Sequence, residues 1–394
     1  MVTAVTDTYS VRDRTAIVGV GHTGCSKDAG VSPQVLWMRA IRQALDDAGL
    51  TAGDIDGIST PYNDPWPTKL VPTPFNLTEA LGLPGLRWHS APLGGAYSLG
   101  SVAAAVIAVS SGQCDTALAV HAMFRPKKKG PVAYNYKGEQ RAAGLYAYLA
   151  PYGYSVFSQI MASTYRRLLA VGGLRREHLA RLVIDQRSNA MLNPLAVMQK
   201  PLAVDEYMGA RWLAEPLGLY DADMPVDAAV AIIVTRADRA RDCRNTPVLV
   251  GNVATVLGPR PDWVFQGDYT ELFPAKYGRD FWARAVAEPG DLSFAEIQDG
   301  FSVYVPMWLE AMGIVGRGEA GEFIGDGNLA LTGGLPTNTH GGNLSEGRTQ
   351  GGGAVVEAVR QLRGEAGERQ VANPVAGLVT VGGSPTVCAA LLHV

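Results

Sequence analysis

Two parts of the chain repeat the same order of local signals, and this repeat constrains the fold more than any other feature. In residues 94–120, and again in residues 351–381, glycines precede a helix rich in alanine and valine, and an apolar strand follows. A second echo links Leu50 to Ser59 with Leu292 to Ser302, where leucine, hydroxyl, acid and isoleucine occur in the same order. Two echoes in the same order indicate a duplicated α/β half. Each half would supply one glycine loop and one helix start to a shared cleft.

Composition narrows the class of protein. A chain of 394 residues with 47% hydrophobic and 18% charged residues can bury one large core or two joined ones. A net charge of -3 argues against nucleic acid or a membrane surface as a partner. The polar N-terminus has no signal-peptide pattern and no run of 18 apolar residues occurs, so we expect a cytoplasmic protein without a membrane span.

Alternating strand and helix patterns predict a sheet covered by helices. In the first part, strands are expected at 15–20 and 116–120 and helices at 32–50 and 101–111. The stretch from His121 to Pro225 breaks this rhythm with tyrosines, prolines and charges. It carries helical patterns at 158–170 and 176–190, so we interpret it as an inserted, largely helical excursion. Alternation resumes with a strand at 226–235, a strand at 248–253 and a helix at 280–287.

The loop from Gly334 to Gly353 is the strongest candidate for a site. It holds His340 among glycines and runs into a helical pattern from Ala354 to Leu362. Glycines let a backbone approach a ligand closely, and N–H groups at a helix start favour anionic atoms. A tight turn packed against a sheet is the alternative interpretation.

Four motifs together carry a resemblance to a known family. They are Trp212-Leu-Ala-Glu-Pro-Leu217, Thr337-Asn-Thr-His-Gly-Gly342, Leu344-Ser-Glu346 and Ala358-Val-Arg-Gln-Leu-Arg-Gly364. With the duplicated layout, they make the chain resemble the thiolase superfamily, in its lipid-transfer-protein-like branch. The resemblance implies a thiolase-like α/β fold, in which two duplicated mixed-sheet halves pack as an α-β-α-β-α sandwich with an inserted loop domain. The implied boundaries are 1–121 plus 226–243 for the first half, 122–225 for the insertion and 244–394 for the second half.

The chain departs from the thiolase pattern at the catalytic positions. A thiolase holds its acyl group on a cysteine at the start of the first glycine-loop helix, and that position falls at Gly95. The family histidine falls at Arg348, and the second cysteine at Thr380. The four cysteines (Cys25, Cys114, Cys243 and Cys388) show neither metal-ligand spacing nor disulfide density. We therefore expect no metal site, and we expect Cys114 and Cys388 to be structural thiols.

The branch without these cysteines resembles the aldolases of steroid side-chain breakdown, which cleave a β-hydroxyacyl-CoA. Such cleavage needs a base, a group that holds the enolate and an acid. The tyrosines associated with that work fall at Gln298, which cannot carry a proton, and at Arg348, which suits an anion or enolate better than base catalysis. His340 is the best remaining base, unless it is structural. Asp299 either orients one of these groups or caps a loop.

Further residues are expected around the substrate. Tyr97 could enter the space of the lost cysteine, and Gly95, Gly341, Gly342 and Ser345 would contact the substrate.

Tyr152 and Tyr154 either line the pocket from the insertion or are ordinary core aromatics. Arg125, Lys127 and Lys128 either meet the phosphates of coenzyme A or form a solvated loop.

The resemblance also implies partners. We expect no tightly bound cofactor, with coenzyme A entering as part of the substrate. We expect a two-fold homodimer and a small second subunit with an OB-fold, often with a zinc ribbon. Retro-aldol cleavage is the favoured activity. One alternative is a catalytically silent subunit that binds acyl-CoA or scaffolds a partner. The other is a condensing or acyl-transfer enzyme of secondary metabolism.

Overall fold

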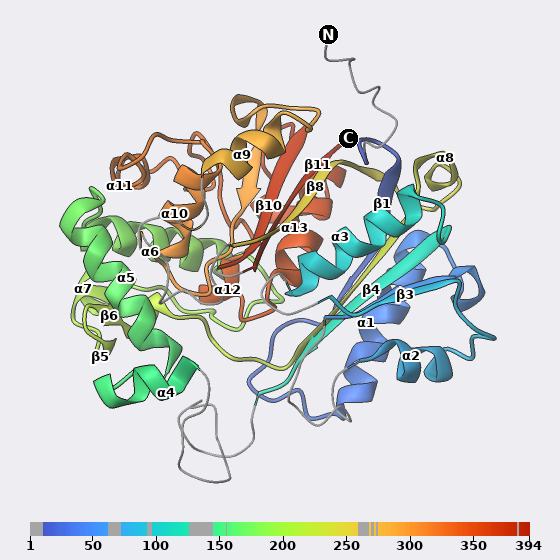
Figure 1. The fold of residues 1–394 in the computed structure, drawn as a ribbon, viewed down its shortest axis with the longest axis horizontal. Helices are drawn as coiled ribbons and strands as arrows, with labels where there is room; N and C mark the ends of the chain where they lie inside the picture. The colour runs from blue at the N-terminus through green and yellow to red at the C-terminus, as the bar shows by residue number, and fades with distance from the viewer. Residues whose placement is uncertain are drawn as a thin grey trace.

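The computed structural model describes residues 11–61, 72–92, 97–125, 145–154, 156–258, 268, 272, 275–383 and 386–394. Nine strands form one mixed sheet in the order β3-β2-β4-β7-β1-β8-β11-β10-β9 (Figure 1). Their bounds are β1 Thr15–His22, β2 Gly57–Ser59, β3 Trp88–Ser90, β4 Thr116–Met123, β7 Ala228–Arg236, β8 Val248–Leu257, β9 Phe294–Glu296, β10 Ala376–Gly382 and β11 Thr386–His393. A separate two-stranded ribbon joins β5 (Trp212–Ala214) to β6 (Leu217–Gly218).

The helices follow the expected alternation. They are α1 Pro33–Ala48, α2 Pro74–Ala80, α3 Tyr97–Ser110, α4 Leu145–Leu149, α5 Phe157–Val171, α6 Arg176–Met191, α7 Val204–Met208, α8 Ala237–Ala240, α9 Ala275–Trp282, α10 Tyr304–Ala311, α11 Ala320–Gly325, α12 Gly342–Ser345 and α13 Gly352–Arg363. Local chemistry sets the ends of α1: the Ser32 side chain accepts a hydrogen bond from the N–H of Val35, Pro33 starts the helix, and Gly49 ends it at φ 70°. None of the described helices is long and apolar enough to cross a membrane.

The sheet repeats one topology twice. In the first half, β1 pairs antiparallel with β7, β7 antiparallel with β4, and β4 parallel with β2. In the second half, β8, β11, β10 and β9 pair in the same way and occur in the same order along the chain. The halves meet where β1 pairs briefly with β8. The duplication predicted from the two sequence echoes is therefore present, in a mixed sheet.

Five layers result from this arrangement. The central layer contains α3 and α13, whose apolar side chains pack in one buried cluster with residues of both half-sheets (Figure 1). Leu99 and Val106 on α3 and Val355 and Val359 on α13 are completely buried there; each contributes about 1.5–3 kcal/mol of hydrophobic stabilisation. On the outer faces, α1 packs against the first half and α10 against the second. The expected α-β-α-β-α sandwich is confirmed.

The described part of residues 122–225 is mainly helical, as expected, and covers the second half. Leu168, Leu179 and Tyr207 share one buried cluster with Trp308 of α10 and Leu378 of β10. The inserted helices therefore have no core separate from that half.

One helix lies earlier than the sequence pattern predicts. The expected helix at 280–287 is α9, which begins at Ala275 and ends at Trp282. The indole N–H of Trp282 donates to the carbonyl of Met312 over 2.7 Å. This long-range hydrogen bond fixes the end of α9 against α10. The periodicity of the local sequence carries no information about it, so the predicted end of the helix was wrong.

Candidate active site

A narrow hollow lies where the glycine loop meets the ends of β9 and β10. Its lining residues come from three segments of the second half: Ile297, Gln298, Asp299, His340, Asn343, Thr349, Gly351, Ala354 and Thr380. Three residues predicted for the site, Gln298, Asp299 and His340, thus lie together. Gly341 and Gly342 continue the same loop.

Asp299 holds the glycine loop in place. Its carboxylate accepts hydrogen bonds from the backbone N–H of Asn343 at 2.8 Å, from that of Leu344 at 3.2 Å, and from the Asn343 side-chain amide at 2.8 Å. A Cβ on Gly342 would lie 2.0 Å from the Asp299 carboxylate, and Gly342 has φ +63°, so glycine is required there. Of its two predicted roles, Asp299 performs the capping one. Burial raises its pKa to about 6, although these hydrogen bonds oppose the shift.

His340 lies between two buried carboxylates. Its Nδ1 is 2.7 Å from Glu296 Oε2, and its Nε2 is 3.7 Å from Glu346 Oε2. Burial alone would lower the pKa of His340, but the charges of Glu346 and Glu296 outweigh it and raise the pKa to about 10. Burial also raises the pKa of Glu296, and the charge of His340 opposes that shift. The attraction across 2.7 Å favours the ionised pair, in which His340 is an imidazolium. In that form His340 is not the free base expected from the sequence, and it can stabilise negative charge or donate a proton.

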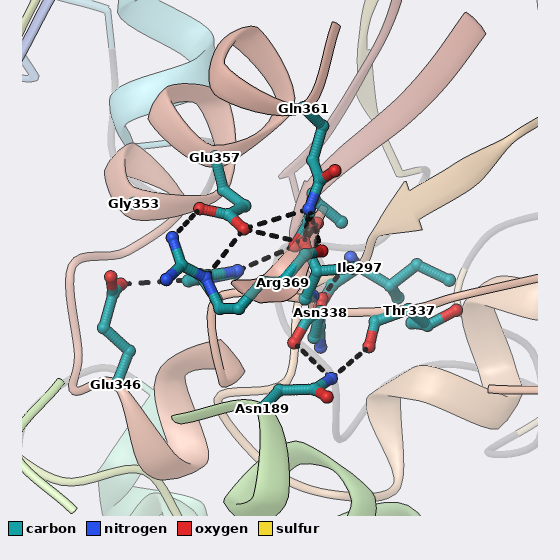
Figure 2. Close-up of polar contacts among 12 residues, drawn as sticks. Asn189, Ile297, Thr337, Asn338, Glu346, Gly353, Glu357, Gln361 and Arg369 are labelled. Atoms are coloured by element: carbon teal, nitrogen blue, oxygen red, sulfur yellow. Dashed lines mark hydrogen bonds and ion pairs between the residues drawn. The ribbon is translucent and has the colours of Figure 1, made fainter. Parts of the chain in front are cut away.

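A larger polar network surrounds this pair. Thr339 donates to Glu296 through both its N–H and its hydroxyl. Glu357 on α13 forms a bidentate ion pair with Arg369, at 3.0 Å for each contact, and accepts from Gln361 (Figure 2). Each buried charge here has a partner of opposite sign, which is the condition for keeping charges inside a protein.

Several of the groups expected to hold an oxyanion have partners within the described part of the protein. Arg348 forms two hydrogen bonds with the Asp223 carboxylate, from Nε at 2.8 Å and from a terminal nitrogen at 2.5 Å. At the start of α13, the N–H of Gly353 donates to the Thr349 hydroxyl at 3.0 Å. The N–H groups of Asn343 and Leu344 donate to Asp299. Arg348 and these amides therefore stabilise the loop.

Among the described residues that line the hollow, Gln298 has unused hydrogen-bonding capacity. The residue is 9% exposed, and its Oε1 has no hydrogen-bond partner in the described part of the chain. An unpaired buried amide oxygen costs about 1–3 kcal/mol unless a ligand supplies a donor. Because an amide can turn about its last bond, the same end can accept from a hydroxyl or donate to an oxyanion.

The remaining predicted residues lie in different places. Tyr97 begins α3, and its ring stacks on that of His121 with centroids 6.4 Å apart. Ser345 is buried in α12 and accepts from Arg187 at 3.0 Å. Gly95, Lys127 and Lys128 fall outside the described residues.

Three predicted residues lie away from the hollow. Tyr152 and Tyr154 line a separate, open groove on the insertion, where Tyr152 is 82% exposed. Arg125 is exposed, and its backbone N–H donates to Asp227.

One group of metal-ligand types occurs among the described residues: His22, Cys25 and Glu346, with ligand atoms within 4.8 Å of one another. The N–H of Gly24 donates to His22 Nδ1 at 2.8 Å, so the proton of the neutral ring is on Nε2, which lies 3.6 Å from Glu346. Burial raises the pKa of Cys25 well above its usual value. Because His22 Nε2 and the Cys25 thiol both carry a proton, these two residues are better suited to stabilising Glu346 than to binding a metal ion.

Sequence reasoning missed four polar residues near the hollow. Glu296 lies in the echo Leu292 to Ser302 and Glu346 in the motif Leu344-Ser-Glu346, but neither was assigned to the site; an acid within the apolar strand Phe294–Glu296 is a usable signal. Ser98 and His121 come from the first half: Ser98 Oγ is 2.5 Å from His121 Nδ1 and 3.3 Å from the carbonyl oxygen of Thr349, which lines the hollow. Both side chains are buried.

Comparison with known proteins places this geometry in a family. Residues 266–392 match the family described as thiolase C-terminal domain-like. The chain is 35% identical to a 17-hydroxy-3-oxo-4-pregnene-20-carboxyl-CoA lyase of Mycobacterium tuberculosis, over 94% of this chain and 97% of that protein. It is 32% identical to a steroid side-chain-cleaving aldolase of Thermomonospora curvata, over 94% and 96%. Its structure is similar to that of the Ltp2-ChsH2(DUF35) aldolase, with a TM-score of 0.87 and 30% identity over 98% of both chains. The chain therefore belongs to the thiolase superfamily, in the lipid-transfer-protein-like branch that includes the steroid side-chain-cleaving aldolases.

Proposed function

We propose that this protein is a carbon–carbon lyase that cleaves a β-hydroxyacyl-CoA by a retro-aldol reaction. One observation carries the proposal: the hollow is lined by amide, carboxylate and imidazole groups, whereas none of the four cysteines lines it. Burial raises the pKa of Cys114 and of Cys388 to about 12, and it also raises those of Cys25 and Cys243. A thiolate nucleophile is therefore not favoured, and retro-aldol cleavage needs none.

The polar groups of the hollow suit the charge that this reaction develops. Cleavage moves the electron pair of the Cα–Cβ bond onto the thioester as an enolate, while the β-hydroxyl becomes a carbonyl. The His340 imidazolium and the unpaired amide end of Gln298 can stabilise that enolate by charge and by a hydrogen bond. Asp299 and the two carboxylates beside His340 keep these groups in place.

The substrate class follows from the relatives. A lyase that acts on a 17-hydroxy-3-oxo-4-pregnene-20-carboxyl-CoA and a steroid side-chain-cleaving aldolase are both more than 30% identical to this chain over almost its whole length. We therefore propose a steroid side-chain thioester as the substrate and coenzyme A as its carrier. Arg125, Lys127 and Lys128 remain the proposed contacts of the coenzyme phosphates.

The proposal includes two partners. The aldolase with the similar structure is named for two components, Ltp2 and ChsH2(DUF35). We propose that this chain likewise works with a small OB-fold subunit, and that two copies pair across a two-fold axis.

The test is direct. The purified chain, alone and with a co-expressed OB-fold partner, is incubated with 17-hydroxy-3-oxo-4-pregnene-20-carboxyl-CoA, and products are followed by mass spectrometry. A 17-ketone together with a shorter acyl-CoA is the expected result. Consumption of free coenzyme A or acyl exchange without cleavage would instead favour a condensing or acyl-transfer enzyme.

A catalytically silent, acyl-CoA-binding subunit is the second candidate. Gln298 and Arg348 favour it, because neither residue shuttles a proton and Arg348 is paired with Asp223. Saturable binding of the acyl-CoA by calorimetry, with no product under any of these conditions, would establish this alternative and refute the lyase.

A further inference from the structure

The proposed reaction requires a base for the β-hydroxyl proton, and three described residues of the hollow, Gln298, Asp299 and His340, do not suit that role. His340 is held as an imidazolium between Glu296 and Glu346. Asp299 is occupied by three hydrogen bonds from the loop, and Gln298 cannot take up a proton. A base other than these three residues is therefore required.

The first half places a buried histidine beside the hollow. His121 lies in β4 and is 3% exposed. Its ring nitrogen Nδ1 is 2.5 Å from Ser98 Oγ, and Ser98 Oγ is 3.3 Å from the carbonyl oxygen of Thr349. Thr349 lines the hollow, so this chain of contacts connects the first half with its wall.

With the ring proton of His121 on Nδ1, every contact of this chain is satisfied. The Ser98 hydroxyl then donates to the carbonyl oxygen of Thr349, and Ser98 Oγ accepts from His121 Nδ1–H, which leaves a lone pair on Nε2. That nitrogen is buried and has no hydrogen-bond partner in the described part of the chain. A buried acceptor without a donor is costly, and a bound hydroxyl group would satisfy it.

Burial keeps the imidazole of His121 in its neutral form. Burial lowers the pKa of His121 to about 4, so the ring is neutral across the physiological range. The Tyr97 ring lies nearly parallel to it, with an interplanar angle of 7°. Together with Ser98, this stacking restricts the rotation of the imidazole.

We propose that His121 is the general base of the reaction and that Ser98 is the positioning residue that fixes its tautomer. The inference rests on the proposed function. Nε2 takes the proton of the β-hydroxyl as the C–O bond becomes a carbonyl and the Cα–Cβ bond breaks. The electron pair passes to the thioester enolate, and Cα then takes up one proton in place of the one that left the hydroxyl, which frees Nε2 again. The step therefore moves one proton from oxygen to carbon and needs no oxidant or other co-reactant.

The kinetic test compares three variants with the wild-type protein, each with its OB-fold partner. A general base contributes roughly 10²–10⁴-fold to rate, so His121→Gln should lower kcat at least about 100-fold while the Kd for acyl-CoA changes little. Ser98→Ala should lower kcat by a smaller factor. His178→Gln is the matched control, because His178 is also a buried histidine but belongs to α6, where it accepts from the N–H of Arg175.

Retention of more than a third of wild-type kcat by His121→Gln would overturn the assignment and leave the lyase proposal standing. Absence of cleavage by the wild-type protein would refute the lyase itself. A second readout does not depend on turnover: ¹⁵N NMR of histidine-labelled protein should show the Nδ1–H tautomer of His121. The Ser98→Ala variant should lose that preference. An Nε2–H tautomer in the wild-type protein would contradict the proposal.

Discussion

Replacing Glu296 by glutamine tests the central feature of the site, the charged His340. The substitution keeps the shape of the side chain and removes its charge. With His340 Nδ1 and Glu296 Oε2 2.7 Å apart, the lost attraction is about 6 kcal/mol at an effective dielectric constant of about 20. Glu346, at 3.7 Å, supplies about 4.5 kcal/mol on the same basis and remains. The glutamine oxygen can still accept the hydrogen bond, which recovers part of the loss.

Two consequences follow from this arithmetic. The pKa of His340 should fall from about 10 by at least about 2 units, since one unit is worth about 1.4 kcal/mol. The protein should also lose about 3 kcal/mol of stability at pH 7. This is the low end of the range for breaking a buried ion pair, because Glu346 still stabilises the imidazolium.

NMR of selectively labelled histidine measures the first consequence, and His340→Gln identifies the resonance among the six histidines of the chain. Glu357→Gln is the matched control, because the charge of Glu357 is already balanced by Arg369. It should shift the His340 titration much less. If His340 in Glu296→Gln stays protonated through pH 9, the electrostatic account of the site is refuted.

Three further predictions concern the loop, the thiols and pH. Gly342→Ala should cost about 3 kcal/mol through contact with Asp299 and a strained φ, whereas Gly367→Ala, at φ +64° with open space around it, should cost about 1 kcal/mol; thermal unfolding compares them, and equal losses would contradict the contact. Alkylation of the native protein with iodoacetamide should leave turnover unchanged, because the four thiols lie outside the hollow and have raised pKa values; inactivation in step with modification would indicate a catalytic thiol. The stabilisation from His340, measured against His340→Gln, should be complete below pH 6.5 and disappear as pH rises from 6.5 through about 10, because its folded-state pKa is raised; a constant difference over that range would exclude the raised pKa.

Local signals in the sequence predict much of the fold and part of the candidate site. The duplicated layout predicts the mixed two-half sheet, because each helix and strand leaves its own periodic pattern. The glycine loop predicts the neighbourhood of His340, and the resemblance adds Gln298 and Asp299, which line the same hollow.

Pairings between distant segments could not be predicted in the same way. Glu296 and His340 are 44 positions apart, and Arg348 and Asp223 are 125 apart. These partners decide the chemistry, because they make His340 an acid instead of a base and occupy the guanidinium of Arg348. The helix-start amides were expected to be available, and only the tertiary structure reveals that Asp299 and Thr349 accept from them.

The duplication also explains why the two helix starts cannot be equivalent. The start of α3 presents Ser98, and the start of α13 presents Gly352; a Cβ on Gly352 would lie 3.2 Å from Ser98 Oγ and 2.3 Å from a methyl group of Val230. Two side chains of ordinary size cannot occupy this junction, so here the start of α3 contributes the Ser98 side chain and the start of α13 contributes the bare backbone of Gly352. That asymmetry lets Ser98 reach the Thr349 carbonyl across the boundary between the halves. With His121 as the proposed base, the first half would hold the base and the second half would hold the enolate, an arrangement that a single α/β half could not provide.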